Sequence, residues 1–248
     1  MVRSARIKHE LASGNLCSEE GRVEWTGRRY RVATSVHRLR SIYGTLDLMP
    51  GRYRFYLLPG SRYLLSADPL DTPQVFCAAL TDVLGQVLRF TKDDLAANRE
   101  GRVSPAQAAR LRSHAIQTGL LVAVFLAVFA GGFFLAFTFR STWYLVSFGV
   151  WVLICLLVLP SMVRYSADRL RDTHDKVAFV HGFGEKDFRR RTRSVIKSYV
   201  VNQERFDVNG RAYEAMVDGE AYRLYYTPLR RTLLSVEAIS LNSPPPSS

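Results

Sequence analysis

The chain has 248 residues, of which 48% are hydrophobic and 23% charged, a balance that excludes wholesale disorder and leaves room for one or two domains. Its formal net charge of +12 favours acidic partners such as anionic lipid, nucleic acid or acidic protein. The three cysteines show no CxxC spacing, so neither a disulfide framework nor a zinc knuckle is predicted.

Two β-hairpins are predicted near the N-terminus. Residues 22–32 (RVEWTGRRYRV) place apolar and aromatic residues around a Thr-Gly turn, and residues 53–68 (YRFYLLPGSRYLLSAD) turn at Pro-Gly. The core face of the second segment is formed by the alternating residues Tyr53, Phe55 and Leu57. We therefore predict a small β unit over residues 1–70.

A helical linker is predicted over residues 71–116. Asp71 or Thr72 can cap a first helix that begins at Pro73. A second, short helix should begin at Thr91.

Two uncharged apolar runs, 117–139 and 143–163, predict a transmembrane helical hairpin. Each run would be roughly 32–35 Å long as a helix, enough to cross a hydrocarbon core of about 30 Å. The first span should continue a helix that begins at Pro105, where Ser104 and Gln107 form a capping box. Neither span holds an ionisable side chain, which argues against an ion or proton transporter.

Lysine and arginine residues flank the outer ends of both spans. Eight lie within twenty residues of these ends, and the turn between the spans holds only Arg140. By the positive-inside rule this predicts a protein integral to the cell (inner) membrane with both termini in the cytoplasm. Residues 164–175 should extend the second span as a cytoplasmic helix, and the tail 241–248 is predicted to be disordered.

A stripe of small residues recurs at every fourth position of the first span. Its members are Gly119, Ala123, Ala127 and Gly131. Small residues let another helix approach closely. The stripe could pack against the second span, or it could mediate self-association between protomers, and both interpretations remain open.

A second β unit is predicted over residues 176–240. Residues 222–237 (YRLYYTPLRRTLLSVE) match residues 53–68 at eight of sixteen positions. Upstream, the Asn-Gly at 209–210 is a strong hairpin signal. Its Gly-Arg, Gly210–Arg211, matches Gly27–Arg28 of the first unit. The predicted fold is thus an α+β membrane protein, with a transmembrane hairpin inserted between two copies of a small SH3-like unit that form a cytoplasmic domain.

The recurring polar residues of the two copies form the first candidate site. On the strand face opposite the core lie an arginine and a tyrosine in each copy, and each copy also repeats an acid. These residues are Arg54, Tyr56, Arg223, Tyr225, Asp68 and Glu237. An arginine beside a tyrosine can stack on the ring and still reach a carboxylate. We expect this set to stabilise the contact between the copies or to form a partner surface.

A basic run forms the second candidate site. Its members are Arg189, Arg190, Arg191, Arg193 and Lys197. Beside a membrane these residues could bind anionic headgroups, or they could belong to a solvated strand. Nucleic acid is not predicted as a partner, because aromatic stacking residues and a known motif are lacking.

No catalytic, cofactor or metal site is predicted. The sequence DTHD at 172–175 could be imagined as a metal site, but a histidine at an exposed helix end is more often solvated. GFGEKD at 182–187 lacks the third glycine of a dinucleotide loop and is interpreted as a turn.

Two functions remain at this point. The first is a non-enzymatic membrane protein that binds a protein partner or organises a membrane complex. The second is a membrane-bound enzyme that acts at the cytoplasmic lipid face with catalytic residues that the sequence does not reveal.

Overall fold

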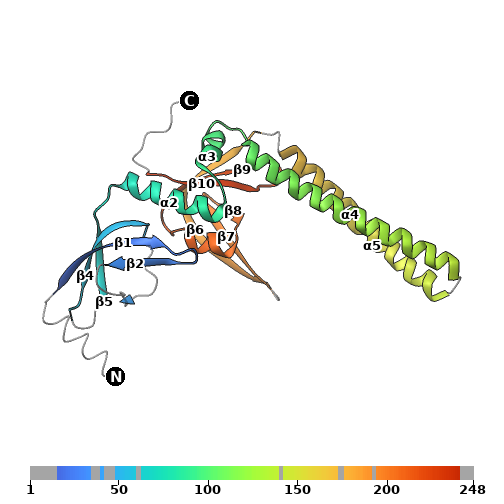
Figure 1. The fold of residues 1–248 in the computed structure, drawn as a ribbon, viewed down its shortest axis with the longest axis horizontal. Coiled ribbons are helices and arrows are strands. Elements are labelled where there is room, and N and C mark those ends of the chain that lie inside the picture. Colours follow the sequence, from blue (N-terminus) through green and yellow to red (C-terminus); the bar gives the residue numbers. More distant parts are fainter. Residues whose placement is uncertain are drawn as a thin grey trace, which may run out of the picture. The chain divides into compact units, whose positions relative to one another are not determined.

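The computed structural model describes residues 16–34, 40–41, 48–59, 63–139, 142–172, 176–191 and 194–240, and has a mixed α+β fold (Figure 1). The chain divides into two compact units. The unit that we call the sheet unit contains the described residues up to Leu95, Phe179–Tyr225 and the described residues from Ser235 onward. The other, the helical unit, contains Ala96–Ala178 and Tyr226–Leu234.

The first sheet of the sheet unit has the strand order β2-β1-β4-β5-β3. Its strands are β1 (Cys17–Trp25), β2 (Tyr30–Thr34), β3 (Arg40–Ser41), β4 (Gly51–Leu57) and β5 (Tyr63–Pro69). The pairs β1–β2, β1–β4 and β4–β5 are antiparallel, and the short β3 runs parallel to β5. Gly27 has a φ of 86° in the β1–β2 turn, so the hairpin predicted at Thr-Gly is confirmed.

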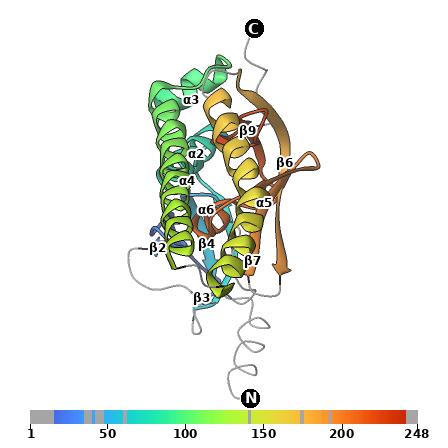
Figure 2. The same ribbon diagram turned by 90° about the vertical axis from the view of Figure 1, so that its right-hand side faces the viewer.

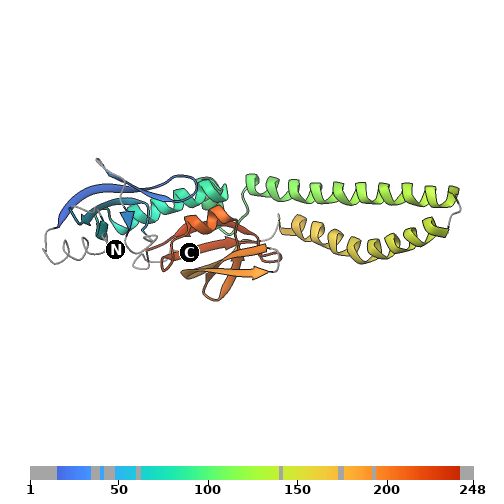
Figure 3. The same cartoon turned by 90° about the horizontal axis from the view of Figure 1, so that it is seen from below.

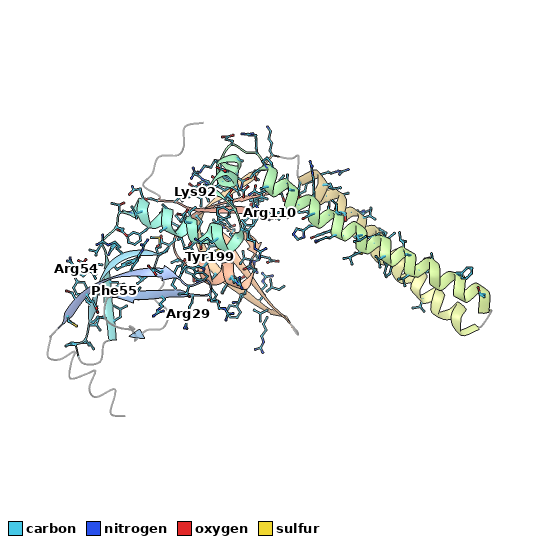
Figure 4. The ribbon with its side chains drawn as sticks, viewed as in Figure 1. Arg29, Arg54, Phe55, Lys92, Arg110 and Tyr199 are labelled. Carbon is cyan, nitrogen blue, oxygen red and sulfur yellow. The ribbon has the colours of Figure 1, made fainter. Side chains whose placement is uncertain are left out.

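Strand β4 has a core face and an outer face, which alternate along its residues. Tyr53, Phe55 and Leu57 are at most 5% exposed, as predicted. Arg54 and Phe55 lie on opposite faces of this strand (Figure 4). Phe76 covers the core face of β4. Its ring lies so close to Gly51 that a Cβ added at Gly51 would be 2.2 Å from the ring. Any other residue at this position would force the Phe76 ring to move.

The second sheet has the strand order β10-β9-β6-β7-β8. Its strands are β6 (Ala178–Arg191), β7 (Ser194–Val201), β8 (Glu204–Asp207), β9 (Ala221–Tyr226) and β10 (Leu233–Ala238). Four strands of each sheet follow the same order, β2-β1-β4-β5 in the first and β7-β6-β9-β10 in the second. The described strands thus form two separate sheets and not one composite sheet.

Two tyrosines organise the core of the second sheet. Tyr199 and Tyr222 are fully buried and meet edge to face, with ring centroids 5.4 Å apart. The Tyr199 hydroxyl donates to the carbonyl of Val217 at 2.7 Å, and the Tyr222 hydroxyl accepts from its N–H at 2.9 Å. A Cβ at Gly184 would lie 2.2 Å from the Tyr199 ring, so glycine is also needed here.

The prediction of a hairpin at Asn209–Gly210 is wrong. Asn209 instead caps the short helix α6 (Gly210–Ala215), and its side-chain oxygen accepts a hydrogen bond from the N–H of Ala212 at 2.8 Å. The turn lies upstream between β7 and β8, at Asn202 and Gln203, which have φ values of 49° and 67°. The segment 182–187, interpreted as a turn, lies within strand β6.

Helix α2 (Pro73–Leu88) begins as predicted and contacts both sheets. Thr72 occupies the N-cap position, although its side chain makes no capping hydrogen bond. The carboxylate of Asp71 accepts a hydrogen bond from a backbone N–H of β4 at 2.8 Å. Phe76 packs on the first sheet, and the hydroxyl of Thr81 accepts from the backbone of β10 at 3.0 Å.

The helical unit contains two long helices, α4 (Pro105–Phe139) and α5 (Thr142–Asp172), preceded by the short α3 (Lys92–Arg99). Ser104 and Gln107 form the predicted capping box, with side chain to backbone distances of 3.1 and 3.4 Å. The two helices run side by side in opposite directions (Figures 1, 2 and 3). Among the described residues, one helical stretch, Pro105–Gly132, has the length and composition to cross a membrane.

Candidate functional site

The first recurring Arg–Tyr pair lies on the outer face of β4. The guanidinium of Arg54 lies 3.1 Å from the carboxylate of Glu20 on β1, and the two side chains are 47% and 54% exposed. This hydrogen bond raises the pKa of Arg54 above its ordinary value. Asp68, the predicted carboxylate, lies opposite Arg54 in the β4–β5 register, but Glu20 makes the ion pair.

The second pair lies on β9 and is much more buried. Tyr225 is 2% exposed, and its hydroxyl donates to the carboxylate of Glu237 on β10 at 3.1 Å. Burial raises the pKa of Tyr225. The guanidinium of Arg223 lies 5.8 Å from the ring centroid of Phe179 on β6. The structure thus brings Arg223, Tyr225 and Glu237 together within the second sheet. These contacts are to residues of that same sheet.

Residues that the sequence analysis did not single out connect the two sheets. The hydroxyl of Tyr30 on β2 donates to the carbonyl of Ala215, at the end of α6, at 2.6 Å. Burial raises the pKa of Tyr30, so its hydroxyl stays protonated and can donate this hydrogen bond. Helix α2 packs against α6 as well as against β4.

Beside this connection lies a groove of about 1060 Å³, which we call the basic groove. Four parts of the sheet unit line it: the β1–β2 turn, the end of α2, strand β7 and the start of α6. The lining residues are Trp25, Gly27, Arg28, Gln86, Val87, Leu88, Arg89, Lys197, Asn209, Gly210, Arg211 and Glu214.

Positive charge dominates the basic groove, because four cationic side chains and one carboxylate line it. The ammonium of Lys197 lies 2.8 Å from the carboxylate of Glu214 and 4.7 Å from the ring centroid of Tyr213. Within the described part of the chain, Arg28 and Arg211 form no ion pair. The groove can therefore accept an anionic group without first breaking an ion pair at either arginine.

The sequence held a signal for this groove. Gly27–Arg28 and Gly210–Arg211 are the two Gly-Arg pairs that the sequence comparison aligned, and both pairs line the groove. The match was interpreted as a repeated hairpin, whereas one pair lies in a hairpin turn and the other begins a helix. Of the residues predicted as sites, Lys197 lines the groove.

The remaining predicted site residues lie elsewhere. The small residues of the α4 stripe, Gly119, Ala123, Ala127 and Gly131, are exposed. A Cβ at either glycine would meet no described atom within 4 Å. Of the basic run, Arg189 and Arg190 are exposed on β6 beside Phe188, which is 66% exposed.

Parts of two predictions lie outside the described residues. These are the side chain of Arg191, Arg193, and residues 173–175 of the DTHD sequence. Asp172 is buried, and its carboxylate accepts a hydrogen bond from the hydroxyl of Thr227 at 2.9 Å. Searched over the described residues, the structure holds no group of three His, Cys, Asp or Glu side chains that could bind a metal ion.

Comparison with protein-family models, with curated proteins and with solved structures finds no match to this chain.

Proposed function

We propose that the chain is an integral protein of the cell (inner) membrane that serves as a non-enzymatic binding or scaffolding component of a membrane complex. In this proposal α4 and α5 cross the bilayer as a hairpin. Both termini and the sheet unit are then cytoplasmic, and the sheet unit binds the partner.

The observation that carries the membrane proposal is the apolar surface of α4. Its large apolar side chains are 53% to 69% exposed at Ile116, Leu120, Leu121, Val124, Val128 and Phe134. Removing one such side chain from water is worth about 1.5–3 kcal/mol when burial is complete. A row of them on one helix is therefore unfavourable in water and favourable in a hydrocarbon core.

The charge distribution supports the cytoplasmic orientation, with eight basic residues near the outer ends of the spans and Arg140 in the turn. Reporter fusions at Ser248 and after Arg140 test it. We expect cytoplasmic activity from the first fusion and external activity from the second. An external C-terminus would contradict the proposal.

We also propose that the two sheets derive from duplication of a small SH3-like unit. Two features support this. The sixteen-residue match falls on β4–β5 and β9–β10, and these strand pairs hold corresponding places in the two sheets. A structure of a relative with a single sheet and the same four-strand order would strengthen the proposal, and one with a different order would count against it.

The stripe on α4 is proposed to mediate self-association of protomers, because its four residues are exposed in the single chain. Replacing Ala127 by Leu should then reduce the oligomer size in mild detergent. Leu126, an exposed neighbour on a different face, provides a matched control through Leu126→Phe. An unchanged oligomer size in Ala127→Leu would show that the stripe meets lipid.

Anionic headgroups are proposed as ligands of Arg189 and Arg190, at about 1 kcal/mol for each residue near the surface. The exposed ring of Phe188 beside them suits the interfacial region. Hydrogen exchange of β6 should slow when neutral nanodiscs are replaced by nanodiscs with anionic lipid. An unchanged rate would indicate a solvated strand.

Binding is favoured over catalysis by the residues of the basic groove. Arginine and tryptophan are typical of interaction surfaces, and both line the groove. Purification from the native membrane in mild detergent should recover a co-purifying protein. Recovery of the chain alone, repeated after cross-linking, would contradict the scaffolding role.

A membrane-bound enzyme that acts at the cytoplasmic lipid face is the second candidate. It is favoured by the composite nature of the groove, which combines elements of both sheets and contains the Lys197–Glu214 pair. Turnover of a membrane lipid extract by the purified protein, abolished by Glu214→Gln, would favour this candidate.

A further inference from the structure

We propose that the basic groove binds an acidic polypeptide segment, in which Asp or Glu carboxylates are recognised by Arg28 and Arg211. The inference rests on the binding role proposed above and specifies the class of the partner. Three properties of the groove lead to it: its charge, the position of the two arginines and its polar, open form.

The charge of the groove sets the sign of its ligand. Lys197 and Glu214 largely neutralise each other at 2.8 Å, and the other charged lining residues are arginines. The whole chain is also positive, at +12. Such a field attracts anionic segments and accelerates their association at low salt.

The two matched arginines approach the groove from different sheets. Arg28 lies in the β1–β2 turn of the first sheet, and Arg211 lies in α6, which follows β8 of the second. Both arginine side chains are exposed, and each follows a glycine at which an added Cβ would meet nothing within 4 Å. A guanidinium can bind a carboxylate with two parallel hydrogen bonds, which makes arginine suited to this role.

The form of the groove favours a polypeptide over a small molecule. Small-molecule sites are mostly apolar and enclose their ligand, whereas this lining is largely polar, with Val87, Leu88 and Trp25 as its large apolar residues. The ring of Trp25 is held edge-on against Tyr30, with centroids 5.0 Å apart. A fixed tryptophan beside arginines is the composition expected of a protein-binding hot spot.

The test uses the full chain purified in a neutral detergent and a fluorescently labelled decaglutamate peptide, followed by anisotropy. We expect saturable binding that weakens at least tenfold when Arg28→Glu and Arg211→Glu are combined, since two attractive contacts become repulsive. Raising the salt concentration from about 50 to about 500 mM should also weaken binding, because it screens the charges. The matched control combines Arg22→Glu with Arg31→Glu, which changes the net charge by the same amount: both side chains are exposed on the same hairpin and neither lines the groove.

Several outcomes would overturn the inference. Equal affinity of the double variant and the wild type would exclude these arginines. An equal loss in the control variant with Arg22→Glu and Arg31→Glu would show that overall charge causes the effect. Binding of a fluorescent nucleotide or of anionic vesicles, with decaglutamate inert, would assign the groove to a different ligand. Hydrogen exchange of β2 and α6 in each variant verifies that the fold is retained. Membrane anchoring is measured separately, by retention in the membrane fraction, so failure of the groove proposal leaves the membrane proposal intact.

Discussion

Strands β4 and β9 carry nearly the same residues at 53–56 and 222–225, yet the two outer faces differ. In both strands the first tyrosine lies in the core. On the outer face of β4, Arg54 is exposed and Tyr56 half-buried, whereas Tyr225 on β9 is 2% exposed.

The neighbouring strands cause this difference. Beside β4, β1 presents the exposed carboxylate of Glu20. Beside β9, β6 presents the ring of Phe179, 6.3 Å from that of Tyr225, and β10 presents Glu237. The local sequence decides the face to which a side chain points, and the adjacent strand decides whether that face is buried. Identical residues should therefore contribute different stabilities.

Truncating the outer tyrosine should give the largest contrast. Tyr225→Ala removes a buried ring and should cost about 3–5 kcal/mol in the second sheet, whereas Tyr56→Ala should cost about 1 kcal/mol in the first. Hydrogen exchange resolved to the peptides of β9–β10 and β4–β5 measures each sheet separately. Equal losses in the two sheets would show that the difference in burial has no energetic consequence.

The alternation of buried and exposed residues along β4 was predictable, because apolar and polar residues alternate there over several positions. Tyr53, Phe55 and Leu57 were identified as core from this pattern alone. The capping box of Ser104 and Gln107 was equally predictable, since its interactions lie within four residues.

The groove and α6 were not predictable in the same way. Asn209 can begin a turn or cap a helix, and both uses satisfy its local chemistry. The choice depends on tertiary contacts, such as the hydrogen bond from Tyr30 to Ala215, whose partners lie 185 residues apart. Tyr225 likewise contacts Phe179, from a part of β6 that was not predicted as a strand.

Removing the core hydroxyls should give the next largest contrast. The Tyr222 hydroxyl bonds both the N–H and the carbonyl of Val217. The Tyr53 hydroxyl has one hydrogen-bond partner among the described residues, the carbonyl of Met49 at 3.1 Å. Tyr222→Phe leaves a buried N–H unpaired and should cost about 1–3 kcal/mol, against about 1 kcal/mol for Tyr53→Phe. The same hydrogen-exchange experiment compares the two variants. A larger loss of stability in Tyr53→Phe would show that the Tyr53 hydroxyl contributes more than the Tyr222 hydroxyl.

Alkaline pH should reveal the contribution of Tyr53 to the stability of the first sheet. Burial raises its pKa from 10.0 to about 12. Below pH 10 the phenol is protonated in both the folded and the unfolded chain. Between pH 10 and 12 the unfolded chain releases this proton while the folded chain keeps it, so the free energy of unfolding falls as pH rises.

The variant Tyr53→Phe tests this pH dependence. It should make the decline in stability of the first sheet between pH 10 and 12 less steep, with no change in slope between pH 7 and 9. Part of the decline should persist, because burial also raises the pKa of Tyr30 on β2. The control is Tyr222→Phe, which should leave the decline of the first sheet as it is in the wild type. A decline that persists unchanged in Tyr53→Phe would assign it to other groups.

The smallest contrast concerns the arginines, and it separates a structural role from a partner surface. Arg223 lies 5.8 Å from the ring of Phe179 on the partly covered face of β9, so Arg223→Ala should cost about 1 kcal/mol in the second sheet. Arg54 is exposed and its partner Glu20 is also exposed, so Arg54→Ala should leave the exchange rates of β4 unchanged. If Arg54 instead binds a partner, Arg54→Ala should weaken a co-purifying complex while stability stays constant. The control is Arg52→Ala, an exposed neighbour on the same face, which should not weaken the complex. A loss of stability in Arg54→Ala equal to that in Arg223→Ala would mean that the two outer faces, despite their different burial, contribute alike.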